Sequence, residues 1–402
     1  MPGPKCIGML SAHYAKGRKI FSFEYDKEWI HSEEQLLLDP DIGWYSGAQF
    51  PAGKENFGIF IDSMPDNWGQ ALMKRRAAQL AGIKGVPAPT LYETDFLLGV
   101  NDNSRMGGLR FKLDVNGPFL DDQLSSPTPP WASVRELQHS AAIFENNNDT
   151  EEVSKWLALL IAPGSSLGGA RPKANILDDE GHPWIAKFPS RNDSINKAAW
   201  EYLAYLLAIE SKINMADCRI EKVYGPYHTF FTRRFDRKNG ERIHFASAMT
   251  MTGHNEDINK TDPPSYLDLA EFIQYSGANI EEDLHQLWRR IIFNIAISNT
   301  DDHLRNHGFI LSNNGWHLSP AFDINPSADK NGLALNIDSN NNALDFGLAK
   351  SVGQYFQLRE EQMDDIIHEI IHAVSKWRTV ATDIGISRAE QGQMEAAFKF
   401  YI

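Results

Sequence analysis

Apolar and polar residues alternate most regularly in the middle of the chain. Two runs rich in apolar residues, Lys173–Leu177 and Pro183–Phe188, flank a polar turn at 178–181, and this pattern predicts a β-hairpin. Apolar residues then recur at helical spacing between Ser194 and Glu210, and a further strand is expected over Tyr227–Phe235. The pattern therefore predicts a small sheet whose strands are interrupted in sequence by one helix.

Beyond Asp236 the pattern becomes mostly helical. A stripe of apolar residues at helical spacing leads into a polar loop at 299–306, and its members are Leu284, Leu287, Trp288, Ile291, Ile292 and Ile295. Residues Asp364–Trp377 carry a second such stripe. Two short β-like runs, Gly308–Leu311 and Trp316–Leu318, follow the loop and predict a strand, a turn and a strand.

The first third of the chain carries weaker signals. Short β-like runs are expected over Lys19–Tyr25 and Gly58–Ile61. A helix is expected to open near Asp62, to carry Pro65 in its first turn and to end at Gly82, because proline is tolerated at a helix start and glycine favours a helix end.

Polar segments indicate where the chain divides. Residues 114–130 are crowded with Asp, Ser, Gly and Pro, and residues 146–149 form a second polar break. We therefore expect an α+β protein with an N-terminal subdomain over 1–150, a sheet-containing lobe over 151–236 and a helical lobe over 237–402.

Composition narrows the class of protein. The 402 residues carry a formal net charge of -14, which disfavours autonomous, non-specific binding to nucleic acid. Cys6 and Cys218 lie far apart without a CxxC partner, so neither a disulfide framework nor a zinc ribbon is expected. The apolar stretches are too short to span a bilayer, and the N-terminus lacks a signal-peptide pattern. We expect a cytoplasmic protein.

Three polar residues in the C-terminal half have the spacing of a phosphoryl-transfer site. Asp301 and Asn306 lie five positions apart, and Asp323 follows the two short β-like runs. Phosphoryl transfer needs a carboxylate that orients the attacking hydroxyl, and an amide oxygen with a second carboxylate that hold Mg²⁺ on the nucleotide phosphates. The spacing therefore predicts a site for ATP and Mg²⁺.

A glycine-rich loop and two charged residues could serve the same chemistry. The loop at 164–169 stands between an expected helix, Val153–Ile161, and a strand, where small residues let backbone N–H groups approach an anion. Lys173 adds a positive charge near it. In the next strand, Lys187 would point into the cleft, and Glu201 on the following helix could hold it by an ion pair.

Two other classes of function remain open. His303, His307 and His317 lie near the aspartates, an arrangement that a metal-dependent hydrolase could use. Alternatively, the chain is a nucleotide-binding pseudoenzyme that acts as a co-repressor by docking on a DNA-binding partner.

The chain resembles the HipA family of serine/threonine kinases, which are toxins of bacterial toxin–antitoxin systems. The specific parts of the resemblance are the loops Ser166–Lys173 and Thr300–Asn306, and the supporting parts are Ser63–Gly69, Ile185–Pro189 and Arg234–Arg237. It covers most of the chain. It implies a two-lobed protein kinase-like fold with an additional N-terminal α/β domain and a mostly helical C-lobe.

The resemblance also implies how the nucleotide is held. The loop residues that would cover the ATP phosphates are Gly168, Gly169, Ala170, Arg171 and Lys173. Lys187 would contact the phosphates, backbone atoms from Arg233 to Phe235 would hold adenine, and His303 is a further candidate contact. The chain departs from the family at two positions, because Arg233 replaces a residue that is often acidic and Asp302 replaces one that is often glycine.

Catalysis and regulation follow from the same resemblance. It implies that Asp301 is the catalytic base and that Asn306 and Asp323 bind Mg²⁺. It also implies inhibitory autophosphorylation at Ser166, or at the adjacent Ser165, where a phosphate would add about two negative charges at the place of the ATP phosphates.

The family's partners complete the expectation. Its known protein substrate class is an aminoacyl-tRNA synthetase, whose phosphorylation slows translation. Its usual partner is a small helix-turn-helix antitoxin, so contact with DNA would be indirect and through that partner. No membrane contact is expected.

Overall fold

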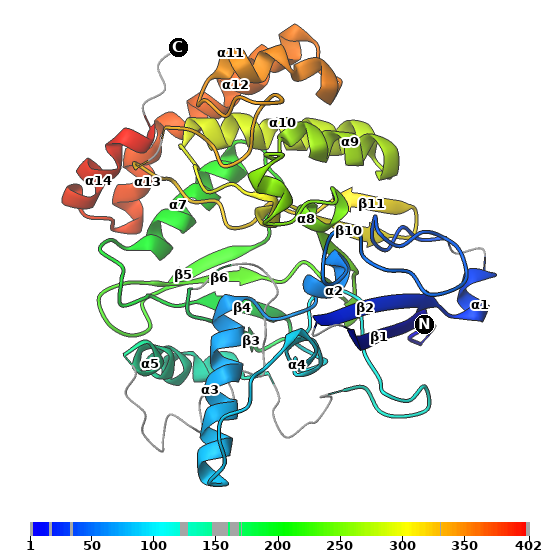
Figure 1. The fold of residues 1–402 in the computed structure, drawn as a ribbon. Coiled ribbons are helices and arrows are strands. Elements are labelled where there is room, and N and C mark those ends of the chain that lie inside the picture. Colours follow the sequence, from blue (N-terminus) through cyan, green and yellow to red (C-terminus); the bar gives the residue numbers. More distant parts are fainter. Residues whose placement is uncertain are drawn as a thin grey trace.

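A small antiparallel sheet separates the two main groups of helices in this protein. Helices from the N-terminal third cover one face of the sheet, and the C-terminal helices lie beyond the other face (Figure 1). The computed structural model describes residues 3–15, 18–32, 35–120, 128–146, 160, 169, 171–329 and 331–398.

The central sheet has four antiparallel strands in the order β3-β4-β6-β5. They are β3 (Lys173–Leu177), β4 (Pro183–Lys187), β6 (Thr229–Arg233) and β5 (Cys218–Glu221). The predicted hairpin is confirmed as β3 and β4, in a register that places Lys173 opposite Lys187. β6 confirms the predicted strand but ends at Arg233, two residues earlier than expected.

Alternation along the strands gives the sheet two different faces. The packed face meets two helices, α3 (Asn67–Ile83) and α5 (Val134–Glu145), in one apolar cluster. The cluster includes Ala174, Ile176, Trp184, Ala186 and Phe231 from the strands, and Trp68, Leu72, Val134, Leu137 and Ala141 from the helices. The residues between them, such as Ile185 and Lys187, point to the opposite face, as expected for a period of two.

Helix α7 (Lys197–Glu210) lies between the sheet and the C-terminal helices (Figure 1). It begins three residues after the expected position, because the Asn196 side chain caps it by accepting a hydrogen bond from the N–H of Ala199. Its buried face carries the predicted apolar residues Ala199, Leu203 and Leu207.

The C-terminal part is mostly helical, as predicted. Its longest helix, α10 (Ile280–Ala296), carries the predicted apolar stripe, and each residue of that stripe is fully buried. The second predicted stripe belongs to α12 (Glu360–Ser375), and Trp377 begins a separate helix. The remaining helices are α8 (Ala248–Met251), α9 (Tyr266–Ser276), α11 (Phe346–Ser351), α13 (Trp377–Ile384) and α14 (Arg388–Met394).

Two smaller sheets connect these parts. The predicted strand-turn-strand passage is confirmed as β10 (Gly308–Ser312) and β11 (Gly315–Leu318), and β9 (Phe245–Ser247) pairs with the other edge of β10. β7 (Arg237–Lys238) and β8 (Glu241–Arg242) form a short ribbon. Single 3₁₀ turns are η1 (Trp131–Ser133), η2 (Ile258–Lys260), η3 (Leu304–Asn306), η4 (Gly353–Phe356) and η5 (Glu395–Phe398).

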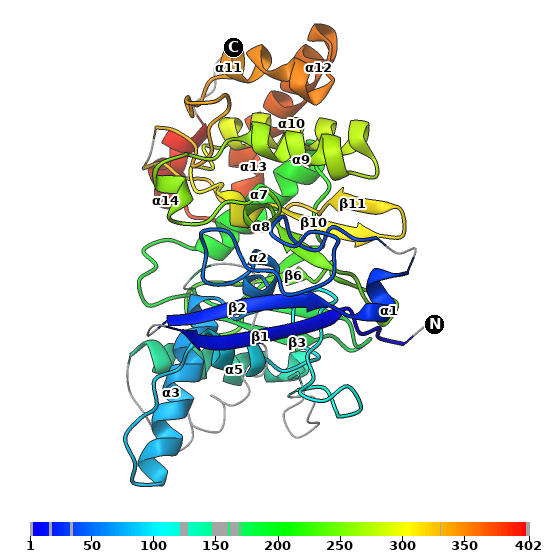
Figure 2. The same cartoon turned by 45° about the vertical axis from the view of Figure 1, so that its right-hand side comes forward.

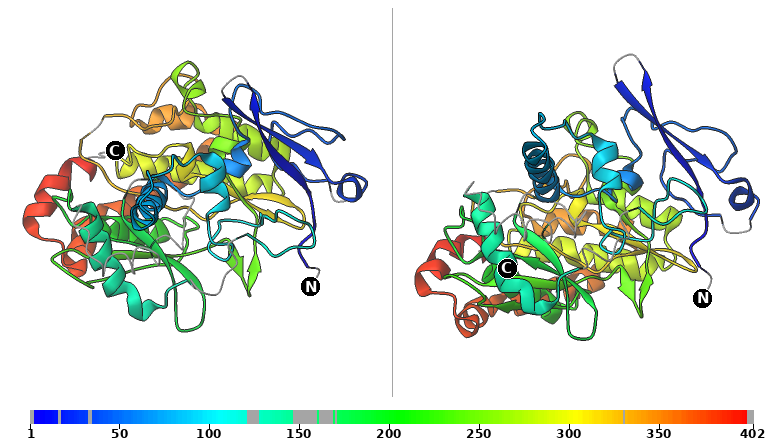
Figure 3. Two further views of the ribbon diagram at one scale, coloured as in Figure 1. Left: turned by 60° about the horizontal axis from the view of Figure 1, so that its bottom comes forward. Right: turned by 90° about the horizontal axis from the view of Figure 1, so that it is seen from below.

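The N-terminal region begins with a long hairpin of β1 (Gly8–Ala15) and β2 (Arg18–Tyr25), which lies in front in Figure 2 and extends outward in Figure 3. β2 confirms the expected strand. Three short helices accompany the hairpin, namely α1 (Lys27–Ile30), α2 (Gly58–Ile61) and α4 (Glu93–Leu98). No described helix is both long enough and apolar enough to cross a bilayer.

Two predictions for this region are wrong. Residues Gly58–Ile61 form a turn of helix instead of a strand, because a run of four residues is too short to distinguish the two patterns. The following helix begins at Asn67 and not near Asp62. Asp66 is its N-cap, and the Asp66 carboxylate accepts a hydrogen bond from the N–H of Gly69.

Candidate active site

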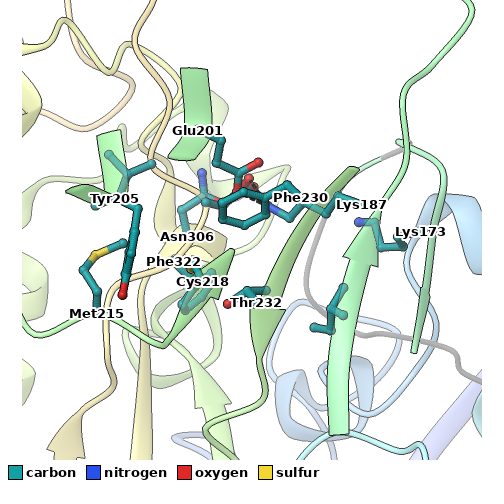
Figure 4. Close-up of a pocket in the computed structure, with 13 residues that line it drawn as sticks. Lys173, Lys187, Glu201, Tyr205, Met215, Cys218, Phe230, Thr232, Asn306 and Phe322 are labelled. Atoms are coloured by element: carbon teal, nitrogen blue, oxygen red, sulfur yellow. Dashed lines mark hydrogen bonds and ion pairs between the residues drawn. The ribbon is translucent and has the colours of Figure 1, made fainter. Parts of the chain in front are cut away.

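A narrow recess opens between the free face of the sheet and the C-terminal part (Figure 4). It is lined by Lys173, Ile185, Lys187, Glu201, Tyr205, Met215, Cys218, Phe230, Thr232, Asn306, Phe322, Asp323 and Ile324. Five of the residues singled out from the sequence therefore meet here, from two strands, one helix and two loops.

Lys187 is the central charge of the recess. Its Nζ lies 2.5 Å from Oε1 of Glu201 on α7 and 2.7 Å from Oδ1 of Asp323. The expected ion pair between Lys187 and Glu201 is present, and the two side chains are only 13% and 9% exposed. A single ammonium group thus joins the sheet, helix α7 and the loop after β11.

The protonation states of these groups follow from their burial and mutual charge. Burial acts to lower the pKa of Lys187, but the carboxylates of Asp323 and Glu201 raise it above its ordinary value. Burial acts to raise the pKa of Asp323, but Lys187 brings it down to about 2. Burial raises the pKa of Glu201, with Lys187 opposing that shift. The ammonium and the Asp323 carboxylate are therefore both charged at neutral pH.

Asp323 has an unusual backbone. Its φ of 58° is left-handed, a conformation that a residue with a side chain rarely adopts. The neighbouring Phe322 ring packs against Phe235 and Phe245, with centroid distances of 5.7 Å and 6.4 Å. The packed ring and the left-handed residue together direct the Asp323 carboxylate toward Lys187.

The loop that carries Asp301 is held through its own backbone. The Asn306 side-chain amide donates to the Asp301 carbonyl oxygen at 3.0 Å, and the N–H of His303 donates to the same oxygen at 2.9 Å. Asn306 is buried and lines the recess, whereas the Asp301 side chain is exposed. Because Nδ2 of Asn306 makes the loop contact, its amide oxygen remains available as an acceptor.

Asp302 is a buried residue for which the sequence predicted no structural role. Its carboxylate lies 2.5 Å from the Tyr266 hydroxyl, 2.7 Å from Nδ2 of Asn294 and 2.7 Å from Nε2 of His307. These contacts anchor the loop to α9 and α10. The departure from glycine at this position therefore has a structural role.

The histidines do not form a metal cluster in the described part of the chain. His307 contacts Asp302, while His317 contacts Ser312 and Asn314 through its Nε2. No group of three or more His, Cys, Asp or Glu side chains within the described ranges could hold a metal ion. His303 is half-buried and lies near Asp323, where a positive charge on the imidazole would lower the pKa of that carboxyl.

Most of the glycine-rich loop lies outside the described residues, and the undescribed part includes Ser165, Ser166, Gly168 and Ala170. Most of the expected helix at 153–161 also lies outside them. Gly169 has a left-handed φ of +110°. Arg171 makes two hydrogen bonds to the carboxylate of Asp193, at 2.9 Å and 2.6 Å.

Lys173 has a partner that no local pattern indicated. Its Nζ lies 2.7 Å from Oδ2 of Asp66, and both side chains are almost fully buried. The indole N–H of Trp68 also donates to the Lys173 carbonyl oxygen at 3.0 Å. The start of helix α3 thereby supports the strand that lines the recess.

The segment expected to hold adenine follows strand β6. The Phe235 ring packs on Phe322 beside the recess, and the half-exposed Arg233 side chain lies 3.7 Å from Asp217. The fully buried carboxylate of Asp236, the next residue after Phe235, pairs with Arg234 at 2.6 Å. Arg234 also donates to the carbonyl oxygens of Ser104 and Arg105, which ties this segment to the N-terminal region.

Comparison with known proteins places this arrangement in a family. The HipA-like C-terminal domain family matches residues 165–377, which is more than half of the 402 residues. No curated protein sequence matches the chain.

Among solved structures, a chain of the Shewanella oneidensis MR-1 toxin–antitoxin complex of HipA, HipB and operator DNA matches with a TM-score of 0.66. The match has 17% identity and covers 98% of this chain and 92% of that chain. The Helicobacter pylori proinflammatory kinase CtkA matches with a TM-score of 0.36 and 12% identity, over 53% of this chain and 94% of that chain.

The Shewanella match confirms the predicted fold, an α+β HipA-like kinase fold with an extra N-terminal region and a helical C-terminal part. Together with the family match, it confirms the resemblance found in the sequence. The chain belongs to the HipA-like C-terminal domain family.

Proposed function

We propose that this protein is an ATP- and Mg²⁺-dependent serine/threonine protein kinase of the HipA toxin type. The observation that carries the proposal is the Lys187 ammonium held between Glu201 and Asp323, with Asn306 lining the same recess. In protein kinases a strand lysine braced by a helix glutamate positions the nucleotide phosphates. The family match supports the same proposed function.

The nucleotide would enter the recess in a defined orientation. Ile185 and Thr232 line its sheet side and Phe322 lines its C-terminal side, so an adenine ring would lie between apolar surfaces next to the backbone of Arg233–Phe235. The phosphates would then extend toward Lys187, which would exchange its contact with Asp323 for phosphate oxygens and keep Glu201. Gly168 to Lys173 would cover them.

The residues present fit a magnesium ion. Mg²⁺ prefers hard oxygen ligands, and the Asp323 carboxylate and the Asn306 amide oxygen are of that kind on one side of the recess. Asp323 stays ionised because of its depressed pKa. When bound, the ion would neutralise charge on the transferring phosphoryl group.

Asp301 would act on the substrate hydroxyl. Its exposed carboxylate would accept the proton of a serine or threonine and orient the oxygen toward the γ-phosphorus, and the P–O bond to the leaving ADP would break as the new one forms. Its position is set by the two hydrogen bonds to its carbonyl oxygen. Positioning and charge neutralisation, without a covalent intermediate, would provide the rate.

The finer parts of the proposal come from the family. We infer a cytoplasmic toxin that phosphorylates a translation-related protein such as an aminoacyl-tRNA synthetase and is switched off by autophosphorylation at Ser166 or Ser165. We also infer a small helix-turn-helix antitoxin as partner. The matched Shewanella structure holds HipA with HipB and operator DNA, and the net charge of -14 here suits DNA contact through a partner.

An Asp301→Asn substitution tests the catalytic assignment. The variant should bind ATP about as well as the wild-type protein and lose phosphate transfer by at least about 100-fold, because it cannot accept the hydroxyl proton. Labelled ATP incubated with pure protein measures self-labelling, and phosphosite mapping on a treated cell lysate identifies the substrate. Equal transfer by the variant would exclude Asp301 as the base. Nucleotide binding without any transfer by the wild-type protein would favour the co-repressor function.

A further inference from the structure

Two lysines lie directly opposite each other on neighbouring strands of the central sheet. The register of β3 and β4 pairs Lys173 with Lys187, and both side chains line the recess (Figure 4). Like charges at directly opposite positions destabilise a pair of strands. Glu201 and Asp323 compensate for the charge of Lys187. The carboxylate that pairs with Lys173 is Asp66, which comes from the N-terminal region.

Helix α3 holds Lys173 at two points. Oδ2 of Asp66 lies 2.7 Å from Nζ of Lys173, and the two side chains are only 3% and 5% exposed. The indole N–H of Trp68 donates to the carbonyl oxygen of Lys173 at 3.0 Å. The start of one helix therefore fixes both the side chain and the backbone of this residue, although Asp66 is 107 positions earlier in the chain.

The Asp66 carboxylate is itself held in place. Its Oδ1 accepts a hydrogen bond from the N–H of Gly69 at 2.8 Å, which makes Asp66 the N-cap of α3. A lysine ammonium stands on a flexible four-carbon stem and adopts many positions unless a partner holds it in one. Because this carboxylate is buried and bonded to a helix end, it restricts Nζ of Lys173 to one position.

The Lys173 ammonium lies close to two parts of the site that would meet the ATP phosphates. A Cβ atom on Gly169 would lie 3.5 Å from Nζ of Lys173, so the glycine-rich loop passes this charge at Gly169. Burial acts to raise the pKa of Asp323, whereas Lys187 and then Lys173 lower it. Because a charge shifts a neighbour's pKa at short range, Lys173 is also near the carboxylate proposed to bind Mg²⁺.

We propose that Asp66 is a positioning residue of the kinase site and holds the Lys173 ammonium where it meets the ATP phosphates. The inference rests on the proposed kinase function and gives the N-terminal region a part in it. Asp66 acts through Lys173 and does not itself contact the nucleotide. Two cations in fixed places, Lys173 and Lys187, would hold the phosphates from two strands in line for transfer.

A double-mutant cycle tests the proposal. Asp66→Asn keeps an oxygen that caps α3, because asparagine is as good an N-cap as aspartate, but it removes the charge that faces Lys173. Incubation of the full chain with γ-labelled ATP measures self-labelling. The maximal rate should fall about tenfold or more, because the phosphates would be held out of line. The ATP concentration that gives half of the maximal rate should not rise, because Lys173 still attracts the phosphates.

The second arm of the cycle repeats the substitution without the lysine. Lys173→Met should itself label at least about tenfold more slowly than the wild-type protein. In that background, Asp66→Asn should change the maximal rate by less than about twofold, because no ammonium remains to be positioned. An equal fall in both backgrounds, or an unchanged rate in Asp66→Asn alone, would contradict the proposal.

A matched control replaces an N-cap aspartate elsewhere. Asp345 is exposed, caps α11 by accepting a hydrogen bond from the N–H of Gly347 at 2.6 Å, and does not line the recess. Asp345→Asn should label at the wild-type rate. A loss equal to that of Asp66→Asn would attribute the effect to capping and overturn the proposal. Asp66→Ser also keeps a capping oxygen without a charge, so it should behave like Asp66→Asn and replaces that variant if it is poorly folded.

The same experiment separates the two proposals. Transfer by the wild-type protein with equal effects of Asp66→Asn in both backgrounds would support the kinase function and refute the role of Asp66. No transfer at all by the wild-type protein, to itself or to proteins of a cell lysate, would overturn the kinase function and this inference with it.

Discussion

At the scale of single residues, Lys187 and Asp302 show how burial assigns roles. Lys187 is held by two carboxylates at the recess, whereas Asp302 is a carboxylate held by three donors inside the C-terminal part. Each is a buried charge whose partners compensate for the loss of water. Substitution of either residue should therefore change the free energy of unfolding.

Replacing Lys187 by methionine should reduce both activity and stability. Phosphate transfer should fall about 100-fold or more, because the phosphates would lose a fixed cation. The free energy of unfolding should fall by about 3 kcal/mol, because Glu201 and Asp323 would face each other without a counterion. Transfer kinetics and urea denaturation measure the two effects.

Lys212→Met is the matched control for that experiment. Lys212 also forms a short ion pair, with Glu369, but it is 67% exposed and lies away from the recess. An exposed pair contributes at most about 1 kcal/mol, so activity should be unchanged. Normal transfer by Lys187→Met would contradict the proposed contact with the phosphates.

Substitution of either adjacent aspartate by asparagine should change the free energy of unfolding by very different amounts. Asp302→Asn should lower the free energy of unfolding by about 2 to 4 kcal/mol, because a buried acceptor of several hydrogen bonds loses its charge. Asp301→Asn should change it by less than about 0.5 kcal/mol, because the carboxylate is exposed. Thermal denaturation of both variants measures the two losses of stability. A larger loss in Asp301→Asn than in Asp302→Asn would contradict the assignment of Asp302 as the structural residue.

At the scale of helices and strands, repeated patterns were predictable and short ones were not. The β3–β4 hairpin and helix α10 follow from apolar periodicity over many residues, because burial on one face imposes it. Residues Gly58–Ile61 lack that repetition, and their helical turn depends on contact with α8. The start of α3 was placed too early because the Asp66 cap, not Pro65, determines it.

Gly58 offers a direct test of this helix contact. Gly58→Ala should destabilise the protein by about 1 to 3 kcal/mol, because its Cβ would lie within 3.0 Å of three atoms of Thr250. The double variant Gly58→Ala/Thr250→Ala should recover part of that loss. Urea denaturation measures all the variants.

Gly82→Ala is the control for the glycine experiment. Gly82 lies in helix α3 with open space around the position of a Cβ, so alanine there should stabilise the protein by about 0.5 to 1 kcal/mol. Destabilisation of the same size at both glycines would indicate that helix contact is not the cause.

At the scale of the whole molecule, the sequence indicated which residues share a site but not what supports them. Asn306 and Asp323 were predicted from their spacing relative to Asp301, and Lys187 was predicted from its place in a strand before the helix that carries Glu201; all three line the recess. The supporting contacts join distant segments, such as Arg234 with the carbonyl oxygens of Ser104 and Arg105. No local pattern encodes such contacts, and none indicated that Asp302 is buried against Tyr266, Asn294 and His307.

The pair between Asp66 and Lys173 has a consequence for how this protein can be divided. The two residues are 107 positions apart, and Asp66 lies outside the matched residues 165–377. A fragment restricted to those residues would lose this counterion, and the sheet would expose to water the apolar surface that α3 and α5 now protect. The kinase-like half therefore cannot be moved alone into another protein. A gene fusion that carried only this half would need new helices over the packed face of the sheet and an acidic residue beside Lys173.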